Sequence, residues 1–418
     1  MSKKQLFTAI GPFLTALLII AVVIYSPFNW FSKPTAEEIE KSASSMSVNV
    51  LKGNVMKNEA VASGDYLPFF GSSELSRFDA YHPSVLAKKY DRDYTPFLLG
   101  APGTQSLTHF QMMNSMGEKL RGKKAVFIIS PQWFVKDGVS DPMFSNFYSP
   151  LQMNQYLMNL EKPDEYDQYL GKRLLHFSSI KKDTEMKATL KGLKQGEAPT
   201  TLEHKKETYT YHMLSKQDYL FSRFKLKTYS DKIEKKTKYL PDEYSVEELD
   251  KRAYARGVKA TDNNEFQIIN RFYTSRIAPI KGNLKNSQAD FNFLESPEYR
   301  DFQLVLNTIN KYDMDVLFVI PPVNALWSSY TGLSTDMLDA FSKKITYQLQ
   351  SQGFNHIADY TQRRAEPYFM EDTIHIGWRG WVAMDQDLQT FLSDTNKPHY
   401  DMKTEEFLDK QWENKQVK

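Results

Sequence analysis

The hydrophobic residues of this chain gather in short runs that end at glycine, proline or serine. Five of these runs have the length of β-strands. The run AVFIIS at 125–130 is near-continuously apolar, as in strands that are buried on both faces of a parallel sheet. We therefore predict five strands, at residues 66–70, 95–99, 125–130, 315–320 and 356–359.

Apolar residues recur at helical spacing between these runs. After Thr104 or Ser106, either of which would cap a helix, the apolar positions predict a helix that stops at Gly122. Further helices are predicted over residues 335–349 and 378–392. A strand, a glycine-rich turn, a helix and another strand are typical of βαβ units, so the pattern predicts an α/β fold with a parallel sheet.

Residues 151 to about 290 have a different composition, rich in Lys, Glu, Tyr and Met and poor in β-branched apolar residues. We interpret them as a mainly helical insertion on the sheet core. The stretch 223–238 within it holds seven basic and two acidic residues. The pattern favours a solvated helix face, and the alternative is a contact for an anionic polymer or lipid headgroups.

The N-terminus predicts a membrane anchor. Lys3 and Lys4 precede an uncharged run, whose core at 6–25 has about the 20 apolar residues that a membrane helix needs. The lysines indicate a cytoplasmic N-terminus, which places the rest of the chain outside. A cleaved signal peptide is the alternative, but no small-x-small cleavage site follows promptly.

These patterns divide the chain into four predicted parts. The polar, weakly patterned residues after the anchor read as a partly helical stalk, and the last residues mix charges of both signs. The parts are an anchor at 1–32, a stalk at 33–60, an extracellular domain at 61–398 that contains the insertion, and a charged tail at 399–418.

Composition excludes several classes of site. The formal net charge is only +2, so nothing global indicates nucleic-acid binding. The chain has no cysteine, which excludes disulfides, thiolate zinc sites and a cysteine nucleophile. No pair among the eight histidines has metal-ligand spacing, and we predict neither a metal nor a cofactor.

The stretch DYLPFFGSSELS at 65–76 is the candidate position for a nucleophile. Its strand breaks at Gly71, which permits a tight turn, and two serines lead into a predicted helical turn. A serine there would lie at the carboxyl edge of the sheet, near the N–H groups of a helix N-terminus.

A serine hydroxyl needs a neighbouring base to become nucleophilic, and an oriented histidine is suited to that at neutral pH. His375 differs from the other histidines because Asp372 lies three residues before it and Gly377 marks a turn into a helix. A carboxylate in that position would fix the imidazole tautomer and stabilise its charged form. We predict that Ser73 or Ser72, His375 and Asp372 form the site.

The blocks GSSEL at 71–75 and DTIH at 372–375 resemble the first and last blocks of the SGNH/GDSL hydrolase family. That resemblance implies a flavodoxin-like, three-layer fold with Ser73 as nucleophile, His375 as base and Asp372 as its orienting partner. Ser72 stands where the family has aspartate, which leaves the choice between Ser72 and Ser73 open.

The resemblance also implies donors for an oxyanion. These would be the backbone N–H groups of Ser73 and Gly103, the latter matching the family's glycine after the second strand. The family's asparagine after the third strand has no clear counterpart. Gln132 stands where it would fall and would donate in its place.

Nearly the whole chain resembles the DltD family of the D-alanine incorporation system of Gram-positive bacteria. The N-terminal apolar run, FGSSEL, SPQWF after the third strand and DTIHIGWRGW carry this resemblance. It implies a single-pass cell-membrane protein that passes D-alanine to lipoteichoic acid through a seryl ester, together with the membrane-bound O-acyltransferase DltB and associated pathway proteins. A thioesterase or esterase that removes misplaced acyl groups, and a non-catalytic scaffold for the carrier protein and the acyltransferase, are the alternatives.

Overall fold

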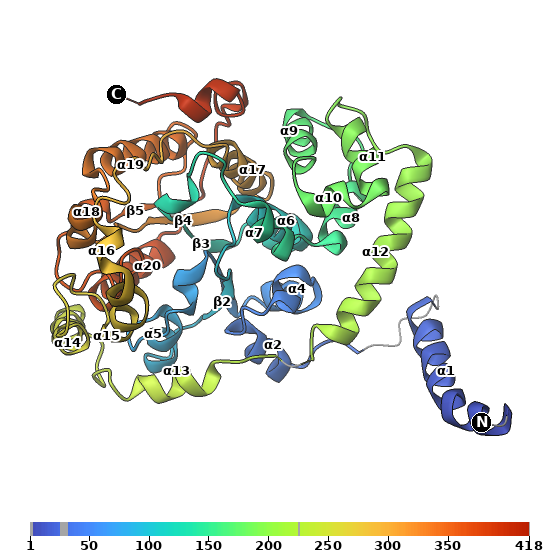
Figure 1. Ribbon diagram of the computed structural model, residues 1–418, viewed down its shortest axis with the longest axis horizontal. Coiled ribbons are helices and arrows are strands. Elements are labelled where there is room, and N and C mark those ends of the chain that lie inside the picture. Colours follow the sequence, from blue (N-terminus) through green and yellow to red (C-terminus); the bar gives the residue numbers. More distant parts are fainter. Residues whose placement is uncertain (1–2, 26–31, 225, 418) are drawn as a thin grey trace.

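The computed structural model describes residues 3–25, 32–224 and 226–417. The second and third of these ranges fold around one parallel sheet (Figure 1). The strands lie in the order β2-β1-β3-β4-β5, and every neighbouring pair is parallel. They are β1 (Tyr66–Phe70), β2 (Thr95–Leu99), β3 (Lys124–Ile128), β4 (Asp315–Ile320) and β5 (Ile357–Asp359). All five strands predicted from the apolar runs are confirmed, with shifts of one or two residues at the ends of β3 and β5.

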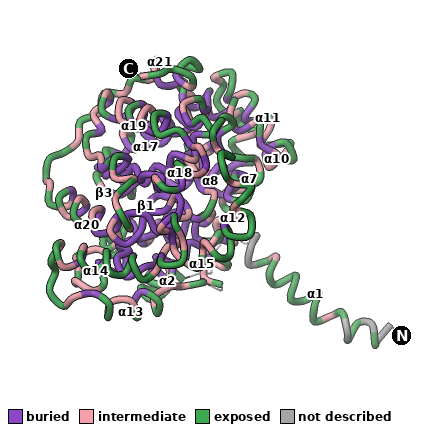
Figure 2. Tube along the Cα trace, turned by 60° about the vertical axis from the view of Figure 1, so that its left-hand side comes forward, coloured by how far each residue is buried: buried purple, intermediate pink, exposed green. Residues whose placement is uncertain are grey.

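Alternate strand residues face two separate helical layers, because successive side chains of a strand point to opposite faces. Phe70, Phe127 and Phe318 pack in one hydrophobic cluster with α4, α6, α17 and α19. Phe69, Val126 and Val319 pack in the other with α5, α13, α14 and α20. The predicted three-layer α/β arrangement therefore holds, with the buried core on both faces of the sheet (Figure 2).

Several of the layer helices have a side-chain N-cap, such as Ser334 before α19, or a glycine at one end, such as Gly64 after α4. The structure forms helices where periodicity predicts them after β2 and β4 and at the C-terminal end. On the first face lie α4 (Val55–Ser63), α6 (Ser106–Met116), α17 (Glu298–Lys311) and α19 (Thr335–Gln350), and on the second α5 (Pro83–Lys89), α13 (Ser230–Thr237), α14 (Val246–Ala260) and α20 (Trp378–Ser393).

The described residues between β3 and β4 form no strand, and the interval 151–290 is helical as the composition predicts. Besides α13, α14 and α17, this interval and its flanks contain α7 (Asp141–Phe147), α8 (Pro150–Met158), α9 (Glu165–Leu174), α10 (Ser178–Lys181), α11 (Thr184–Leu193), α12 (Thr201–Phe221), α15 (Asn270–Phe272) and α16 (Lys281–Leu284). A short α18 (Ala325–Thr331) follows β4.

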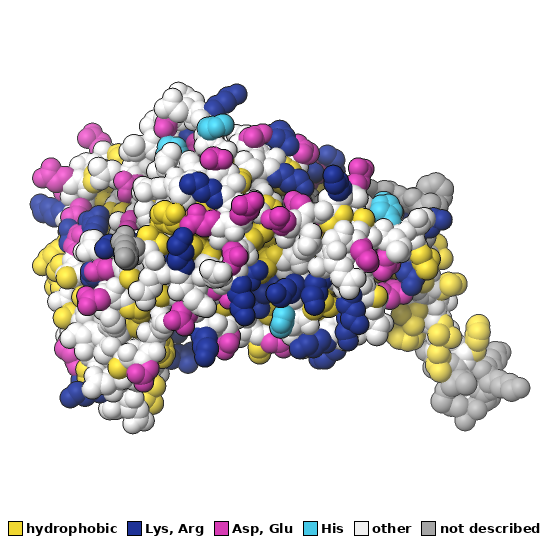
Figure 3. All heavy atoms as spheres, turned by 90° about the horizontal axis from the view of Figure 1, so that it is seen from above, with side chains coloured by type: hydrophobic (Ala, Val, Ile, Leu, Met, Phe, Trp, Pro, Cys, Tyr) yellow, Lys and Arg dark blue, Asp and Glu magenta, His cyan; other side chains and the backbone are white. Residues whose placement is uncertain are grey.

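The N-terminal segment forms α1 (Lys3–Tyr25), which projects from the body and bears exposed apolar side chains (Figures 1 and 3). Of the helices in the described residues, none has both the length and the apolar character needed to cross a bilayer. The span predicted over 6–25 is therefore not confirmed and stays a prediction.

Residues 33–60 are not a free stalk. They form α2 (Ala36–Ala43), α3 (Val48–Lys52) and the start of α4, and α4 packs on β1 and α6. Val50, Leu51 and Met56 are each 1% exposed within the first core cluster. The stalk interpretation was wrong because these few apolar residues are sparse in sequence but fall on one buried side once the short helices form.

The charged tail also folds onto the domain. It forms α21 (Thr404–Phe407) and a 3₁₀ turn at Lys410–Asn414, and Trp412 packs in the first core cluster. The Trp412 indole donates to Gln348 Oε1 on α19 at 3.0 Å. Tyr400, Phe407 and Trp412 all pack on this cluster, and they attach a segment whose other side chains are mostly polar.

Candidate active site

The ends of β1, β2 and β3 lie level at one edge of the sheet. Phe70, the last residue of β1, is in register with Leu99 and with Phe127. The chain must turn tightly there, because a Cβ at Gly100 would lie only 2.0 Å from the carbonyl oxygen of Gly71. Glycine at position 100 therefore allows the loops after β1 and β2 to meet.

The two serines of the turn after β1 have different surroundings. Ser72 is 4% exposed, and its hydroxyl donates to the Ala101 carbonyl (3.2 Å) and accepts from the Gly103 N–H (3.2 Å). Ser73 begins a single 3₁₀ turn, Ser73–Ser76, and is only partly buried. The helix expected here is thus one short turn, too short for a strong dipole.

The hydroxyl of Ser73 lies against His375. Ser73 Oγ and His375 Nε2 are 2.7 Å apart, and His375 Nδ1 is 2.8 Å from each carboxylate oxygen of Asp372. With its proton on Nδ1 and directed at Asp372, the imidazole presents an unprotonated Nε2 to the Ser73 hydroxyl. The structure therefore brings together all three residues of the predicted site, from positions 302 residues apart in sequence.

Asp372 and His375 stand on a loop between β5 and α20. Asp372 Oδ1 accepts the backbone N–H groups of Ile374 and His375, both at 3.1 Å, which closes a tight turn. The Glu371 N–H donates to the His375 carbonyl at 2.8 Å, and the Glu371 carbonyl accepts from Ile269 of the insertion at 2.9 Å. Local turns and the insertion thus hold the loop over the end of β1, although β5 lies at the sheet edge.

Arg77 is a member of the site that the sequence does not reveal. Its guanidinium lies 3.2 Å from both Asp372 Oδ2 and His375 Nδ1. Because Nδ1 donates to Asp372, it cannot also accept from Arg77, and we assign Arg77 to the carboxylate. Burial alone would raise the pKa of Asp372, but His375, Arg77 and the Ile374 N–H hold that pKa below its ordinary value.

The predicted oxyanion donors differ in their availability. The Gly103 N–H donates to Ser72 Oγ, so it would serve an oxyanion only by sharing or releasing that bond. Gln132 lies in a 3₁₀ turn, Pro131–Trp133, directly after β3, and its side chain hydrogen-bonds to no other residue that the structure describes. Its amide is thus uncommitted at the same edge of the sheet as Ser73.

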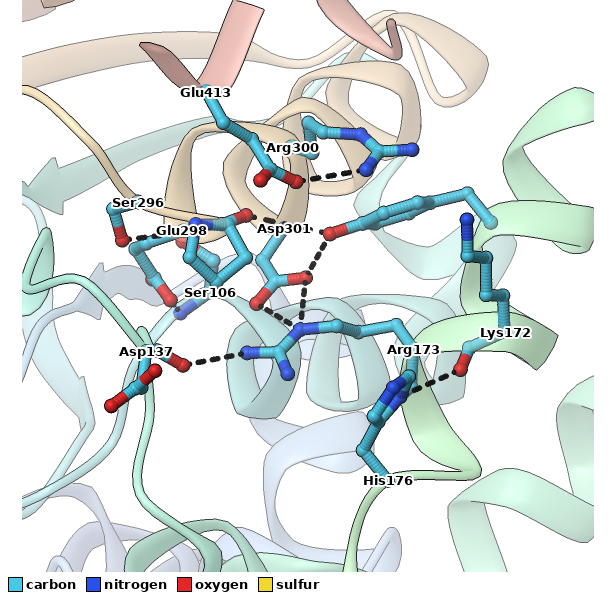
Figure 4. A network of polar contacts seen from close by, with 12 residues as sticks. Ser106, Asp137, Lys172, Arg173, His176, Ser296, Glu298, Arg300, Asp301 and Glu413 are labelled. Atoms are coloured by element: carbon cyan, nitrogen blue, oxygen red, sulfur yellow. Dashed lines mark hydrogen bonds and ion pairs between the residues drawn. The ribbon is translucent and has the colours of Figure 1, made fainter. Parts of the chain in front are cut away.

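A buried polar network fixes the start of α6, which follows the Gly103 loop (Figure 4). The Ser106 N–H donates to Glu298 Oε1 on α17 at 2.9 Å. Asp301, also on α17, pairs with Arg173 of α9 at 3.0 Å and accepts from Tyr169 at 2.6 Å. Burial, with the nearby Asp301 charge, raises the pKa of Glu298 above its ordinary value. The insertion therefore supports the catalytic edge from this side as well.

Comparisons with known proteins identify the family of this chain. The family model described as DltD protein matches residues 43–393. The chain belongs to the DltD family. The protein DltD of Lacticaseibacillus rhamnosus is 46% identical over 98% of this chain and 97% of its own length.

Two more distant DltD proteins match over similar lengths. That of Bacillus subtilis (strain 168) is 33% identical over 93% of this chain and 97% of its own length. That of Staphylococcus aureus (strain NCTC 8325 / PS 47) is 30% identical over 93% and 98%. The 98% coverage of this chain by the Lacticaseibacillus rhamnosus protein includes the insertion, the sheet and most of both terminal segments.

The Ser72→Ala substitution is expected to destabilise this DltD fold without removing the chemistry. It leaves the Gly103 N–H without its acceptor and separates the loops after β1 and β2, at a cost of about 1–3 kcal/mol. Urea unfolding measures the loss, and phosphonate labelling of Ser73 measures the surviving site. Unchanged stability together with lost labelling would contradict this structural role.

Glu371 gives the loop a pH-dependent stability. Burial, with the neighbouring Asp372 charge, raises its pKa to about 8 from an ordinary value of 4.5. The folded chain therefore keeps a proton that the unfolded chain has lost. This stabilisation is complete below about pH 4.5 and disappears as the pH rises through about 8, by up to about 1.4 kcal/mol per pH unit in between.

We expect Glu371→Gln to flatten that dependence, because glutamine cannot lose the proton and keeps both backbone hydrogen bonds of residue 371. Urea unfolding from pH 5 to pH 9 should show a shallower decline in the free energy of unfolding than in the unsubstituted chain. Parallel profiles would mean that Glu371 is ionised at neutral pH in the folded state.

Proposed function

We propose that this chain transfers D-alanyl groups to lipoteichoic acid through a seryl ester on Ser73. DltD proteins are involved in the D-alanylation of teichoic acids. The observation that carries the proposal is the line of contacts from Ser73 Oγ to His375 Nε2 (2.7 Å) and from His375 Nδ1 to Asp372 (2.8 Å). This is the arrangement that activates a serine for acyl transfer.

In the first transfer, the Ser73 hydroxyl gives its proton to His375 Nε2 while Oγ attacks the carbonyl carbon of the incoming D-alanyl ester. The tetrahedral intermediate collapses, and the leaving group takes the proton back from Nε2. Ser73 is then esterified. Asp372 stabilises the transient imidazolium through Nδ1–H, and Arg77 keeps Asp372 ionised.

In the second transfer, a glycerol hydroxyl of the acceptor gives its proton to His375 Nε2 and its oxygen attacks the seryl ester. Ser73 Oγ leaves and recovers the proton. The two steps exchange one ester for another, so the overall reaction is nearly thermoneutral. Selectivity then depends on how well a polyol hydroxyl competes with water for the acyl-enzyme.

Each tetrahedral intermediate carries an oxyanion that needs hydrogen-bond donors. We assign the backbone N–H of Ser73, the Gly103 N–H and the Gln132 amide to this role. The uncommitted Gln132 side chain supports the last assignment. A missing donor would cost about 3–4 kcal/mol of transition-state stabilisation.

We place this reaction on the outer side of the cell membrane, with DltB as the acyl donor and the N-terminal segment as the anchor. The exposed apolar side chains of α1 support membrane contact, because large exposed apolar surfaces mark interaction sites (Figure 3). They include Phe7, Phe13, Leu14, Leu18 and Ile19.

The decisive experiment traps the nucleophile of the full-length protein with a serine-reactive phosphonate and maps the labelled residue. We expect label on Ser73. A D-alanyl donor is then supplied with and without glycerol-phosphate acceptor, and ester product is compared with free D-alanine. Release to water irrespective of the acceptor would replace the transferase proposal with a hydrolase, and absence of label would remove both.

A further inference from the structure

A hollow of about 440 Å³ opens beside the catalytic loop. Arg77, which pairs with Asp372, forms part of its wall, as does Glu371 of the same loop. The proposed acyl-transfer steps use none of its other side chains. Its remaining lining residues are Ser76, Phe78, Lys232, Lys236, Ile269, Arg271, Phe272, Ser275 and Arg276.

The lining of this hollow is strongly basic. Lys232 and Lys236 lie one turn apart on the same side of α13, and Arg271 and Arg276 come from α15 and the π-helical turn Tyr273–Ile277. None of these four forms an ion pair with any residue that the structure describes. Burial, and then repulsion by Lys236, lower the pKa of Lys232. Four cationic side chains without an ion-pair partner, against the single carboxyl group of Glu371 in the same lining, favour the binding of an anion.

The basic surface continues away from the catalytic loop. A second hollow of about 480 Å³ shares Lys232 and Lys236 with the first and adds Lys235 and Lys238, with Asp231 as the acidic residue of its lining. Both hollows therefore lie along α13, an eight-residue helix about 12 Å long. We call this surface, made of Arg77, Arg271, Arg276, Lys232, Lys235, Lys236 and Lys238, the basic track.

The two adjacent hollows of the basic track indicate a ligand with more than one anionic group. One phosphate would occupy one hollow, whereas two separate hollows that share Lys232 and Lys236 in their linings match an anion that repeats along a chain. The track also ends at Arg77, next to His375, so that a chain lying in it would pass the reactive serine. A flat lipid surface would not use a recess beside the catalytic loop in this way.

We propose that the basic track binds a polymer with repeating phosphodiester groups and brings a hydroxyl next to a bound phosphate within reach of Ser73. The inference rests on the proposed function for the identity of the reacting hydroxyl, but binding to the track does not depend on acyl transfer. It assigns part of the basic stretch 223–238 to acceptor recognition, against the solvated-face interpretation that the sequence favours.

The test measures binding of a synthetic glycerol-phosphate oligomer to the full chain at several salt concentrations. Lys232→Glu/Lys236→Glu is expected to weaken binding on the order of tenfold or more and to lower the slope of log affinity against log salt by about 2. The matched control is Lys181→Glu/Lys182→Glu, an exposed pair at the C-terminal end of α10 with the same change of charge. Equal weakening by the control would overturn the inference.

The second test uses Arg271→Ala/Arg276→Ala, in which the substituted residues lie outside α13. It can therefore still be carried out if the α13 variant fails to fold. It too should weaken oligomer binding, and unchanged affinity would count against the track. Inorganic phosphate at matched phosphate concentration should compete poorly; equal competition indicates a single-ion site instead. The last measurement is binding to phosphatidylglycerol vesicles. If the variants lose vesicle binding but keep oligomer binding, the surface contacts the membrane and not the polymer.

These outcomes separate the two proposals. Loss of oligomer binding in the variants, with no acylation of Ser73 in the unsubstituted chain, would support the track and remove the transferase. Labelling and acylation of Ser73 without any oligomer binding would support the transferase and remove the basic track as a binding surface.

Discussion

Replacing Ser73 with alanine is expected to reduce D-alanyl transfer by about 10⁴-fold or more, because the seryl ester can no longer form. Among the side chains of the described residues, the Ser73 hydroxyl forms a hydrogen bond only with His375 Nε2, so we expect its removal to leave the fold intact. The measurement is the transfer of labelled D-alanine to lipoteichoic acid, with thermal unfolding to confirm that the variant is folded.

The Ser72→Ala variant is the control for this experiment. Ser72 lies one residue away, but its hydroxyl bridges two backbone groups and does not contact His375. Its transfer activity should therefore remain well above that of Ser73→Ala. Full activity of Ser73→Ala would make the protein a scaffold, and complete loss confined to Ser72→Ala would identify the other serine as the nucleophile.

The strands could be predicted from the sequence because each is buried on both faces and therefore reads as an apolar run. The sheet order could not, since pairing of β1 between β2 and β3 depends on contacts between distant segments. Short helices such as α3 carry only a few apolar residues, and so residues 33–60 resembled a stalk. These residues are buried because they pack on the helices of the first face of the sheet, which the local sequence does not show.

For the site, the motifs selected Asp372, His375 and the adjacent serines Ser72 and Ser73 without deciding between the serines. The structure places Ser73, and not Ser72, against His375. Arg77 carries no comparable signal. Its pairing with Asp372 depends on the turn that ends the 3₁₀ segment, and nothing in the order of residues distinguishes it from the other arginines. The hydrogen bond from the Gly103 N–H to Ser72 could not be predicted either, because it forms only when the loops after β1 and β2 meet.

The second large effect is expected for Asp372→Asn, which should lower the rate of acyl transfer by about 10⁴-fold while the protein stays folded. Asparagine keeps an oxygen that can accept the Ile374 and His375 N–H groups, so the turn survives. It loses the negative charge that holds the proton on His375 Nδ1. An amide N–H directed at Nδ1 would instead stabilise the tautomer with the proton on Nε2, which cannot accept from Ser73.

Because Arg77 lies beside Asp372, we expect Asp372→Asn to lower the rate of acyl transfer more than it would in a site without a neighbouring arginine. Its guanidinium, 27% exposed, would face a neutral amide and lose its ion-pair partner, which disfavours a positive charge on His375 still further. Arg77→Ala in the Asp372→Asn background should therefore recover part of the lost rate, whereas Arg77→Ala alone should reduce it. Steady-state kcat and KM for each variant decide this. A loss below tenfold in Asp372→Asn would mean that Asp372 only shapes the loop and does not orient the base.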